Sequence, residues 1–95
     1  HQGQYPVIFL TFKDVKAPTW DECYRQLQVI IAEEYRRHNY LLRGATLDKT
    51  QKKRFQSIID QEATLTNYRF SLKNLSNYLH KYHNKKVIIL LDEYG

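Results

Sequence analysis

Cysteine is almost absent from this sequence of 95 residues, in which Cys23 is the single one. One cysteine cannot form an internal disulfide, which excludes the small secreted domains that disulfides stabilise. The sequence also has no run of 18 apolar residues and no charged-then-apolar leader segment. We therefore expect a reduced, cytoplasmic protein that does not enter a membrane.

Glycine is scarce as well, with only Gly3, Gly44 and Gly95. None of them is followed by lysine, so the motif G-x-x-x-x-G-K-[ST] does not occur. The backbone loop that cradles phosphates in many nucleotide-binding proteins is therefore missing from these residues.

The composition is that of a folded protein, with 42% apolar, 26% charged and 14% aromatic residues. A chain of this length buries only about 65% of its unfolded surface, so one small domain of modest stability is expected.

Two short runs are apolar on both faces, and both predict buried strands of a parallel sheet. They are residues 5–12, "YPVIFLTF", and residues 86–92, which contain "VIILLD". Pro6 stands at the start of the first run, where a missing N–H does least harm to strand pairing.

Three helices are predicted between the strands, over about 19–43, 48–60 and 65–83. Thr19 and Glu22 are spaced as a capping box for the first helix, and Thr64 and Asn84 bound the third. Apolar residues recur every three or four positions and predict core faces. In the first helix these are Trp20, Tyr24, Leu27, Ile31, Tyr35, His38 and Leu42; in the third they are Leu65, Tyr68, Leu72, Leu75, Leu79 and Tyr82.

This order predicts an α/β fold, in which two parallel strands are joined by a three-helix crossover. Ligands of such folds bind at the carboxyl ends of the strands, where Asp92 and Glu93 stand. A carboxylate held at a strand tip is suited to binding Mg²⁺, and the next one is suited to activating water. The alternative is that both residues merely solvate the chain and cap the next turn.

The whole chain resembles the predicted AAA-ATPase-like family, bacterial P-loop ATPases that are often fused to a PD-(D/E)XK nuclease-like domain. The resemblance is carried by "YPVIFLTFKDVKAPTWDECY", "IIAEEYRRHNYLL" and "SLKNLSNYLHKYHNKKVIILLDEY", in this order. It implies that residues 86–92 are the Walker B strand, that Asp92 is the metal ligand and that Glu93 is the catalytic, water-activating residue. The cofactors that it implies are ATP and Mg²⁺.

The same resemblance implies that residues 1–95 are part of an ATPase domain with a three-layer sandwich fold, and that its Walker A motif lies upstream. We therefore expect a fragment that is inactive alone and binds neither ATP nor Mg²⁺ tightly. Its partners would be the remainder of the ATPase domain and a possible nuclease-like domain. The family usually has aspartate where Gly95 stands, so a role for that aspartate is not transferred.

The net charge of +5 leaves a second function open, a basic module that binds nucleic acid or another partner. The candidate contacts are Lys49, Lys52, Lys53 and Arg54, with Arg36, Arg37 and Arg43 nearby. The alternative is that these side chains only form solvated helix faces.

Other candidates are weaker. His80 and His83 have the spacing of two ligands on a helix but lack further ligands nearby in the sequence, so a metal site is not predicted. Cys23 has no activating pattern and is expected to pack as a small apolar residue. Trp20 could stack on bases, but its helical spacing favours a place in the core.

The strand over 86–92 also predicts an assembly. Its run "VIILL" is apolar, uncharged and prone to β-structure, and two strands alone make a poor sheet. We expect self-association through the open edge of this strand.

Overall fold

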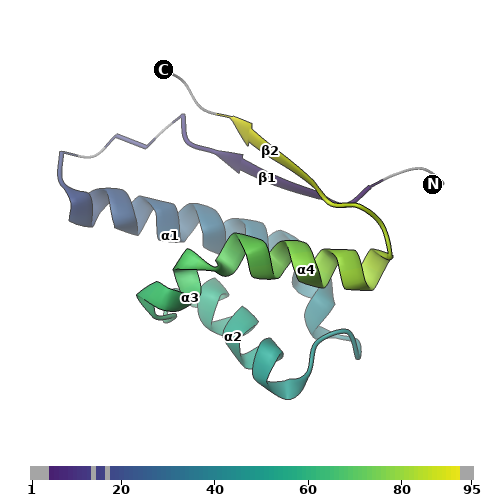
Figure 1. The fold of residues 1–95 in the computed structure, drawn as a ribbon. Helices are drawn as coiled ribbons and strands as arrows, with labels where there is room; N and C mark the ends of the chain where they lie inside the picture. The colour runs from purple at the N-terminus through teal and green to yellow at the C-terminus, as the bar shows by residue number, and fades with distance from the viewer. Residues whose placement is uncertain (1–4, 14, 17, 93–95) are drawn as a thin grey trace.

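The computed structural model describes residues 5–13, 15–16 and 18–92. A parallel pair of strands lies on one side of the molecule, and all the helices lie on the other (Figure 1). Along the chain the elements are β1 (Val7–Thr11), α1 (Trp20–Arg37), the 3₁₀ helix η1 (Asn39–Leu42), α2 (Lys49–Ile59), α3 (Leu65–Arg69), α4 (Ser71–His83) and β2 (Ile88–Asp92).

The two strands pair in parallel, with Val7 opposite Ile88 and Thr11 opposite Asp92. This arrangement confirms the predicted α/β fold with two parallel strands. It also brings the carboxyl ends of β1 and β2 side by side, which is where α/β proteins place their ligands.

The predicted helix over 19–43 is shorter in the structure, because α1 ends at Arg37 and η1 follows it. Thr19 caps α1 by accepting a hydrogen bond from the backbone N–H of Glu22. Asp48 and Gln51 form a reciprocal capping box at the start of α2, within the predicted range of 48–60.

The predicted helix over 65–83 is divided at Phe70 into α3 and α4. Side chains bond the backbone at this point, since the Ser71 hydroxyl donates to the carbonyl of Tyr68 and the Tyr35 hydroxyl donates to the carbonyl of Ser71. A local bond of the kind that Ser71 makes weakens and bends a helix, which fits a break at this point. The predicted ends are confirmed, because Thr64 caps α3 and Asn84 ends α4 with a left-handed backbone.

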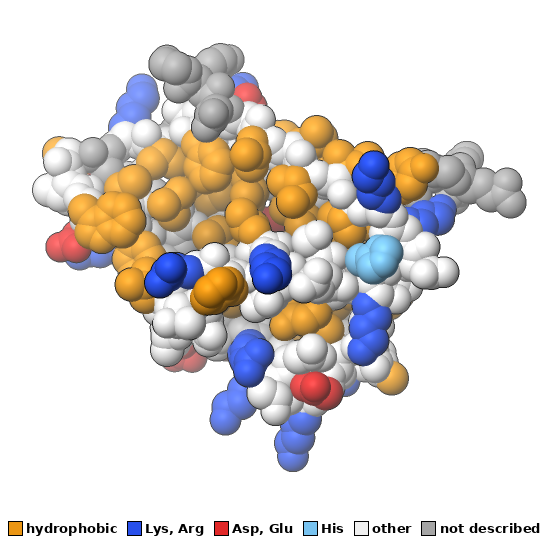
Figure 2. Space-filling model, viewed as in Figure 1, with side chains coloured by type: hydrophobic (Ala, Val, Ile, Leu, Met, Phe, Trp, Pro, Cys, Tyr) orange, Lys and Arg blue, Asp and Glu red, His pale blue; other side chains and the backbone are white. Residues whose placement is uncertain are grey.

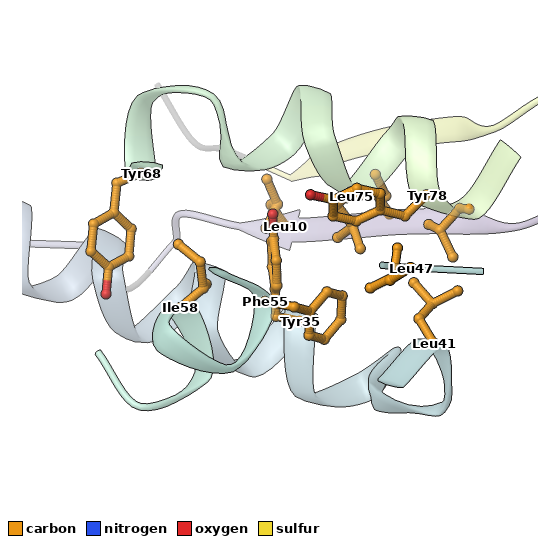
Figure 3. Close-up of a cluster of buried hydrophobic side chains, with 11 residues drawn as sticks. Leu10, Tyr35, Leu41, Leu47, Phe55, Ile58, Tyr68, Leu75 and Tyr78 are labelled. Atoms are coloured by element: carbon orange, nitrogen blue, oxygen red, sulfur yellow. The ribbon is translucent and has the colours of Figure 1, made fainter. Parts of the chain in front are cut away.

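The core lies between the helices and the helix-facing side of β1 (Figure 3). At its centre the rings of Tyr35 and Phe55 lie 4.6 Å apart. Each fully buried side chain of this size stabilises the fold by about 1.5–3 kcal/mol. The buried apolar residues are Ile8, Leu10, Ala32, Tyr35, Leu41, Leu47, Phe55, Ile58, Tyr68, Leu75, Tyr78 and Leu79.

Three members of the predicted core stripes lie at the surface instead: Trp20, Leu65 and Tyr82. Trp20 is 68% exposed and stacks on Tyr24, and Leu65 is 56% exposed. Trp20 and Leu65 are the first residues of their helices, and Tyr82, which is 47% exposed, lies one residue before the end of α4. The prediction of Trp20 as a core residue is therefore wrong.

The prediction that both strands are buried on both faces is also wrong. Ile8 and Leu10 are buried under the helices, but Phe9 points the other way and is 44% exposed. In β2 the residues from Ile88 to Leu91 are exposed on both faces. The physical reason is that a single crossover covers one face of a sheet, and here it covers mainly β1. Hydrophobic side chains accordingly gather on the surface in the upper half of the molecule, which holds the strands (Figure 2).

Across the described segments, every helix is too short or too polar to cross a membrane.

Candidate functional site

The candidate site lies at the carboxyl ends of β1 and β2. The register of the sheet sets Thr11 directly beside Asp92, and the backbone N–H of Phe12 donates to the carbonyl of Asp92 at 2.8 Å. The Thr11 hydroxyl Oγ1 also lies 3.4 Å from the Asp92 carboxylate oxygen Oδ2 and donates to it. The Asp92 side chain is 35% exposed, so the carboxylate is fixed by its neighbours and still open to solvent.

A cation stands next to this carboxylate. The ammonium Nζ of Lys13, in the turn after β1, lies 3.4 Å from the same oxygen, Oδ2 of Asp92. The contacts from Thr11 and Lys13 therefore both fall on Oδ2.

A carboxylate and a hydroxyl at a strand end are hard oxygen donors, which are the ligands that Mg²⁺ prefers. Asp92 and Thr11 thus have the right chemistry for a magnesium site. They do not complete one, since the described residues bring no three His, Cys, Asp or Glu side chains together. Glu93, the predicted catalytic residue, lies outside the described residues.

An open groove of about 320 Å³ adjoins the site on the α1 side of Thr11. Val15, Val29 and Ile30 form apolar walls, and Glu33 and Gln26 are its other lining residues. None of the described residues that line this groove is basic.

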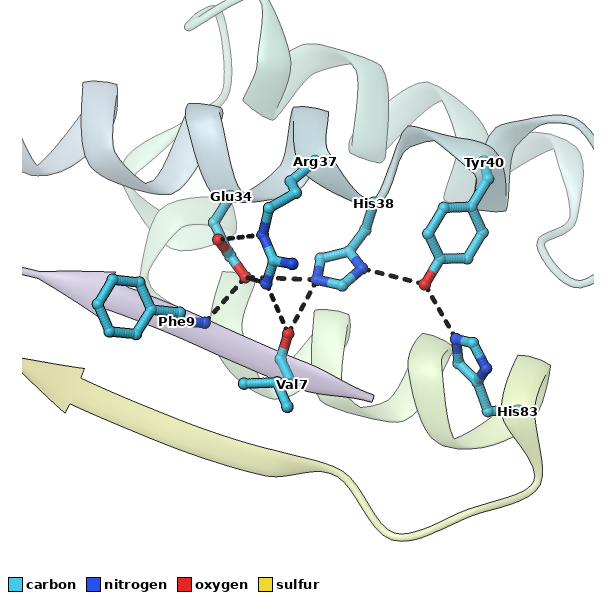
Figure 4. A network of polar contacts seen from close by, with 7 residues as sticks. All are labelled: Val7, Phe9, Glu34, Arg37, His38, Tyr40 and His83. Carbon is cyan, nitrogen blue, oxygen red and sulfur yellow. Dashed lines mark hydrogen bonds and ion pairs between the residues drawn. The ribbon is translucent and has the colours of Figure 1, made fainter. Parts of the chain in front are cut away.

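A second polar cluster, which sequence reasoning missed, lies at the other end of β1 (Figure 4). The Glu34 carboxylate accepts a hydrogen bond from the backbone N–H of Phe9 at 2.9 Å. Arg37 donates to the carbonyl of Val7 at 2.7 Å, and His38 Nε2 lies 3.1 Å from the same carbonyl. Two side chains of α1 and that of the next residue, His38, therefore bond to the edge of β1 that faces away from β2.

Glu34 is ionised in this cluster although its side chain is buried. Burial alone would raise the pKa of Glu34, but hydrogen bonds from His38, Arg37 and the Phe9 N–H, together with the charge of Arg37, lower the pKa to about 2. The buried carboxylate thus has hydrogen-bond and ion-pair partners, without which burying its charge would be strongly destabilising.

The cluster continues from α1 to α4. His38 Nε2 faces only acceptors, the Val7 carbonyl and Glu34, so this nitrogen carries a proton. Its Nδ1 lies 3.0 Å from the Tyr40 hydroxyl, which lies 2.9 Å from His83 Nε2. Burial, followed by the charges of His38 and Lys85, lowers the pKa of His83.

The candidate residues that the sequence did not favour for metal binding have other partners. His83 is bonded to Tyr40, and His80 Nδ1 lies 2.8 Å from the carbonyl of Lys85. Cys23 is a partly buried free thiol of α1. One signal could have revealed the Glu34 cluster: an acidic residue next to the apolar stripe of α1, followed after three and four residues by Arg37 and His38.

In α2, Lys49 and Lys53 lie on the face opposite the buried residues Phe55 and Ile58, whereas Arg54 lies next to those two residues. Lys49, Lys53 and Arg54 are exposed, and Lys52 is partly so. Within the described part of the chain, no ion pair involves α2.

Comparison with known proteins gives one match. Residues 1–95 match a family model, AAA-ATPase-like, which is described as a predicted AAA-ATPase. No curated protein and no solved structure matches the chain.

Proposed function

The chain belongs to the AAA-ATPase-like family, and from this we propose that it supplies the Walker B end of an ATPase sheet. In this proposal Asp92 holds the Mg²⁺ of bound ATP, and Glu93 orients and deprotonates the attacking water.

The observation that carries the proposal is the placement of Asp92. Its carboxylate lies at the carboxyl end of a parallel sheet, next to Thr11, and is partly open to solvent. A ligand side chain that is already held in one orientation binds metal more tightly, because less conformational entropy is lost on binding. The pairing of β2 with β1 and the bond from Thr11 give Asp92 this orientation.

The chemistry divides between the bound nucleotide and the protein. Mg²⁺ bound to ATP supplies charge neutralisation for the phosphate that is transferred. Asp92 would contribute one oxygen ligand from a rigid strand. The Thr11 hydroxyl would either hold the Asp92 carboxylate in place or act as a further oxygen ligand. The 95 residues contain no phosphate-binding loop, so we propose that the isolated chain does not hydrolyse ATP.

Mn²⁺ provides a direct test, because it substitutes for Mg²⁺ and broadens the NMR signals of nearby amides. In the ¹⁵N-labelled chain, we expect millimolar Mn²⁺ to broaden the amide signals of Thr11, Phe12 and Asp92 first. Asp92→Asn should remove this effect, while Asp21→Asn, the same change at an exposed site in α1, should leave it intact. Broadening that survives in Asp92→Asn would overturn the metal role of Asp92.

Calorimetry with Mg²⁺ and ATP tests the second part of the proposal. We expect binding that is too weak to measure at micromolar protein, since the backbone N–H groups and lysine of a phosphate loop are missing. Micromolar affinity that is lost in Asp92→Ala would mean that the chain binds nucleotide by itself.

The basic residues of α2, which form no ion pair with any other described residue, favour a second candidate function, contact with nucleic acid. Such binding releases counterions and weakens steeply with salt. Reversing the charges of Lys49, Lys52, Lys53 and Arg54 should then abolish binding to a DNA or RNA oligonucleotide. Binding that is absent, or unchanged by salt, would eliminate this candidate.

A further inference from the structure

We propose that Lys13 is the resident counter-ion of Asp92 and that a divalent cation must displace its ammonium group in order to bind. This inference rests on the proposed function, since it assumes that Asp92 is a metal ligand. It adds a positioning residue, Lys13, whose charge sets how readily the site accepts metal.

The first argument is geometric. Lys13 lies two residues past the end of β1, and the bond from the Phe12 N–H to the Asp92 carbonyl ties this turn to β2. The Val15 N–H donates to the Phe12 carbonyl at 3.1 Å and closes the turn. The backbone therefore holds the stem of Lys13 beside Asp92, and Nζ reaches to 3.4 Å from Oδ2.

The second argument concerns how the two neighbours of Asp92 differ. Thr11 is part of β1 and has a short, β-branched side chain with few rotamers, so its hydroxyl stays close to Asp92. Lys13 has a flexible four-carbon stem and a side chain that is 42% exposed, so its ammonium can move into water with the backbone unchanged. Lys13 is thus the neighbour that a metal ion would displace.

The third argument is electrostatic. A cation within ion-pair distance of Asp92 repels an incoming divalent ion, and the pair itself must be broken before the metal binds. Ion pairs that are this exposed are weak, and their loss corresponds to about a two- to fivefold change in affinity. Removing the charge of Lys13 should therefore strengthen metal binding by about this factor.

The test compares four proteins by Mn²⁺ titration, with broadening of the Asp92 and Thr11 amide signals as the readout. We expect Lys13→Ala to bind Mn²⁺ about two- to fivefold more tightly than the wild type. Lys13→Arg keeps a cation there and should bind as weakly as the wild type or more weakly. Lys16→Ala changes the net charge equally but removes a side chain with no ion pair among the described residues, so it should match the wild type.

The outcomes separate the two proposals. Equal Mn²⁺ affinities for Lys13→Ala and the wild type, or no binding by either, would overturn the role of Lys13. An equal gain in Lys16→Ala would also overturn it, since the effect would then follow net charge alone. If Asp92→Asn still shows the same broadening, Asp92 is not the metal ligand, and the proposed function is overturned together with the role of Lys13. If Asp92→Asn loses the broadening but Lys13→Ala binds Mn²⁺ as the wild type does, the role of Lys13 is rejected and the metal role of Asp92 stands.

Discussion

The buried carboxylate of Glu34 accepts a hydrogen bond from the backbone N–H of Phe9, so a helix side chain takes the place of a neighbouring strand. The carbonyl of Val7 is bonded in the same way by Arg37 and His38. Unpaired strand edges are sites of unwanted pairing, and side chains that occupy their polar groups block it. The outer edge of β1 is therefore blocked at Val7 and Phe9, which disfavours the addition of a further strand there.

The Glu34 contact predicts how stability depends on pH. The pKa of Glu34 is about 2 in the folded protein, against an ordinary value of 4.5. As the pH falls below 4.5 the unfolded chain takes up the proton first, so the free energy of unfolding decreases between about pH 5 and pH 2. Because Arg37 is half exposed and its charge is screened, we expect a loss of about 2 kcal/mol.

Glu34→Gln is the matched variant for this measurement, since it keeps the shape and an acceptor for the Phe9 N–H. Urea unfolding should give a free energy about 2 kcal/mol below the wild type at neutral pH, and the two curves should converge near pH 2. A gap that stays constant with pH would show that the ionisation of Glu34 does not stabilise the fold.

For β2 we propose self-association through its open edge, because Ile89, Leu90 and Leu91 are each about half exposed. Light scattering should give a mass above that of the monomer at micromolar concentration, and Leu90→Lys should reduce it to the monomer. Leu65→Lys adds the same charge at an exposed apolar residue far from the sheet and should leave the assembly intact. A wild-type chain that is strictly monomeric would contradict this proposal.

The core predicts a contrast between two leucines. Leu75 is fully buried, whereas Leu65 is 56% exposed. Leu75→Ala should lower the free energy of unfolding by about 2–5 kcal/mol, because it removes buried contacts and leaves a cavity. Leu65→Ala should cost less than about 0.5 kcal/mol. Similar losses in chemical denaturation of both variants would mean that the packing around Leu75 differs from that described.

The turn after α2 predicts a stabilising substitution. Gln61 has a φ of 59°, in the left-handed region that favours glycine. Gln61→Gly removes the Cβ strain and should raise the free energy of unfolding by about 0.5–1 kcal/mol. The next residue, Glu62, is not among those with positive φ, so Glu62→Gly should lower stability instead. A lower melting temperature for Gln61→Gly than for the wild type would refute this.

Much of the fold could be predicted because its signals are local. Thr19 and Thr64 cap helices through N–H groups three residues away, and Asn84 ends α4 by its own backbone conformation. The break at Phe70 could not be predicted, because the apolar spacing runs through it without interruption and one of the bonds beside it comes from Tyr35, 36 residues from Ser71.

Some residues of the candidate site could likewise be predicted from the sequence, and others could not. Asp92 stands out in the sequence because an apolar run precedes it. Its neighbours Thr11 and Lys13 do not stand out, because only the register of two distant strands brings them to Asp92. The Glu34 cluster was missed for a related reason, as Phe9 lies 25 residues away and contributes a backbone group that no sequence pattern marks.

The register that joins Thr11 to Asp92 links residues 81 positions apart, and this separation orders events during synthesis. At about 5–20 residues per second, β1 emerges from the ribosome several seconds before β2. Glu34, Arg37 and His38 follow β1 much sooner, so one edge of the strand gains its partners early. The edge of β1 that pairs with β2 stays unpaired until residues 88–92 have been synthesised. During that interval its free backbone groups can pair with other chains, and we expect chaperones to bind the nascent chain there.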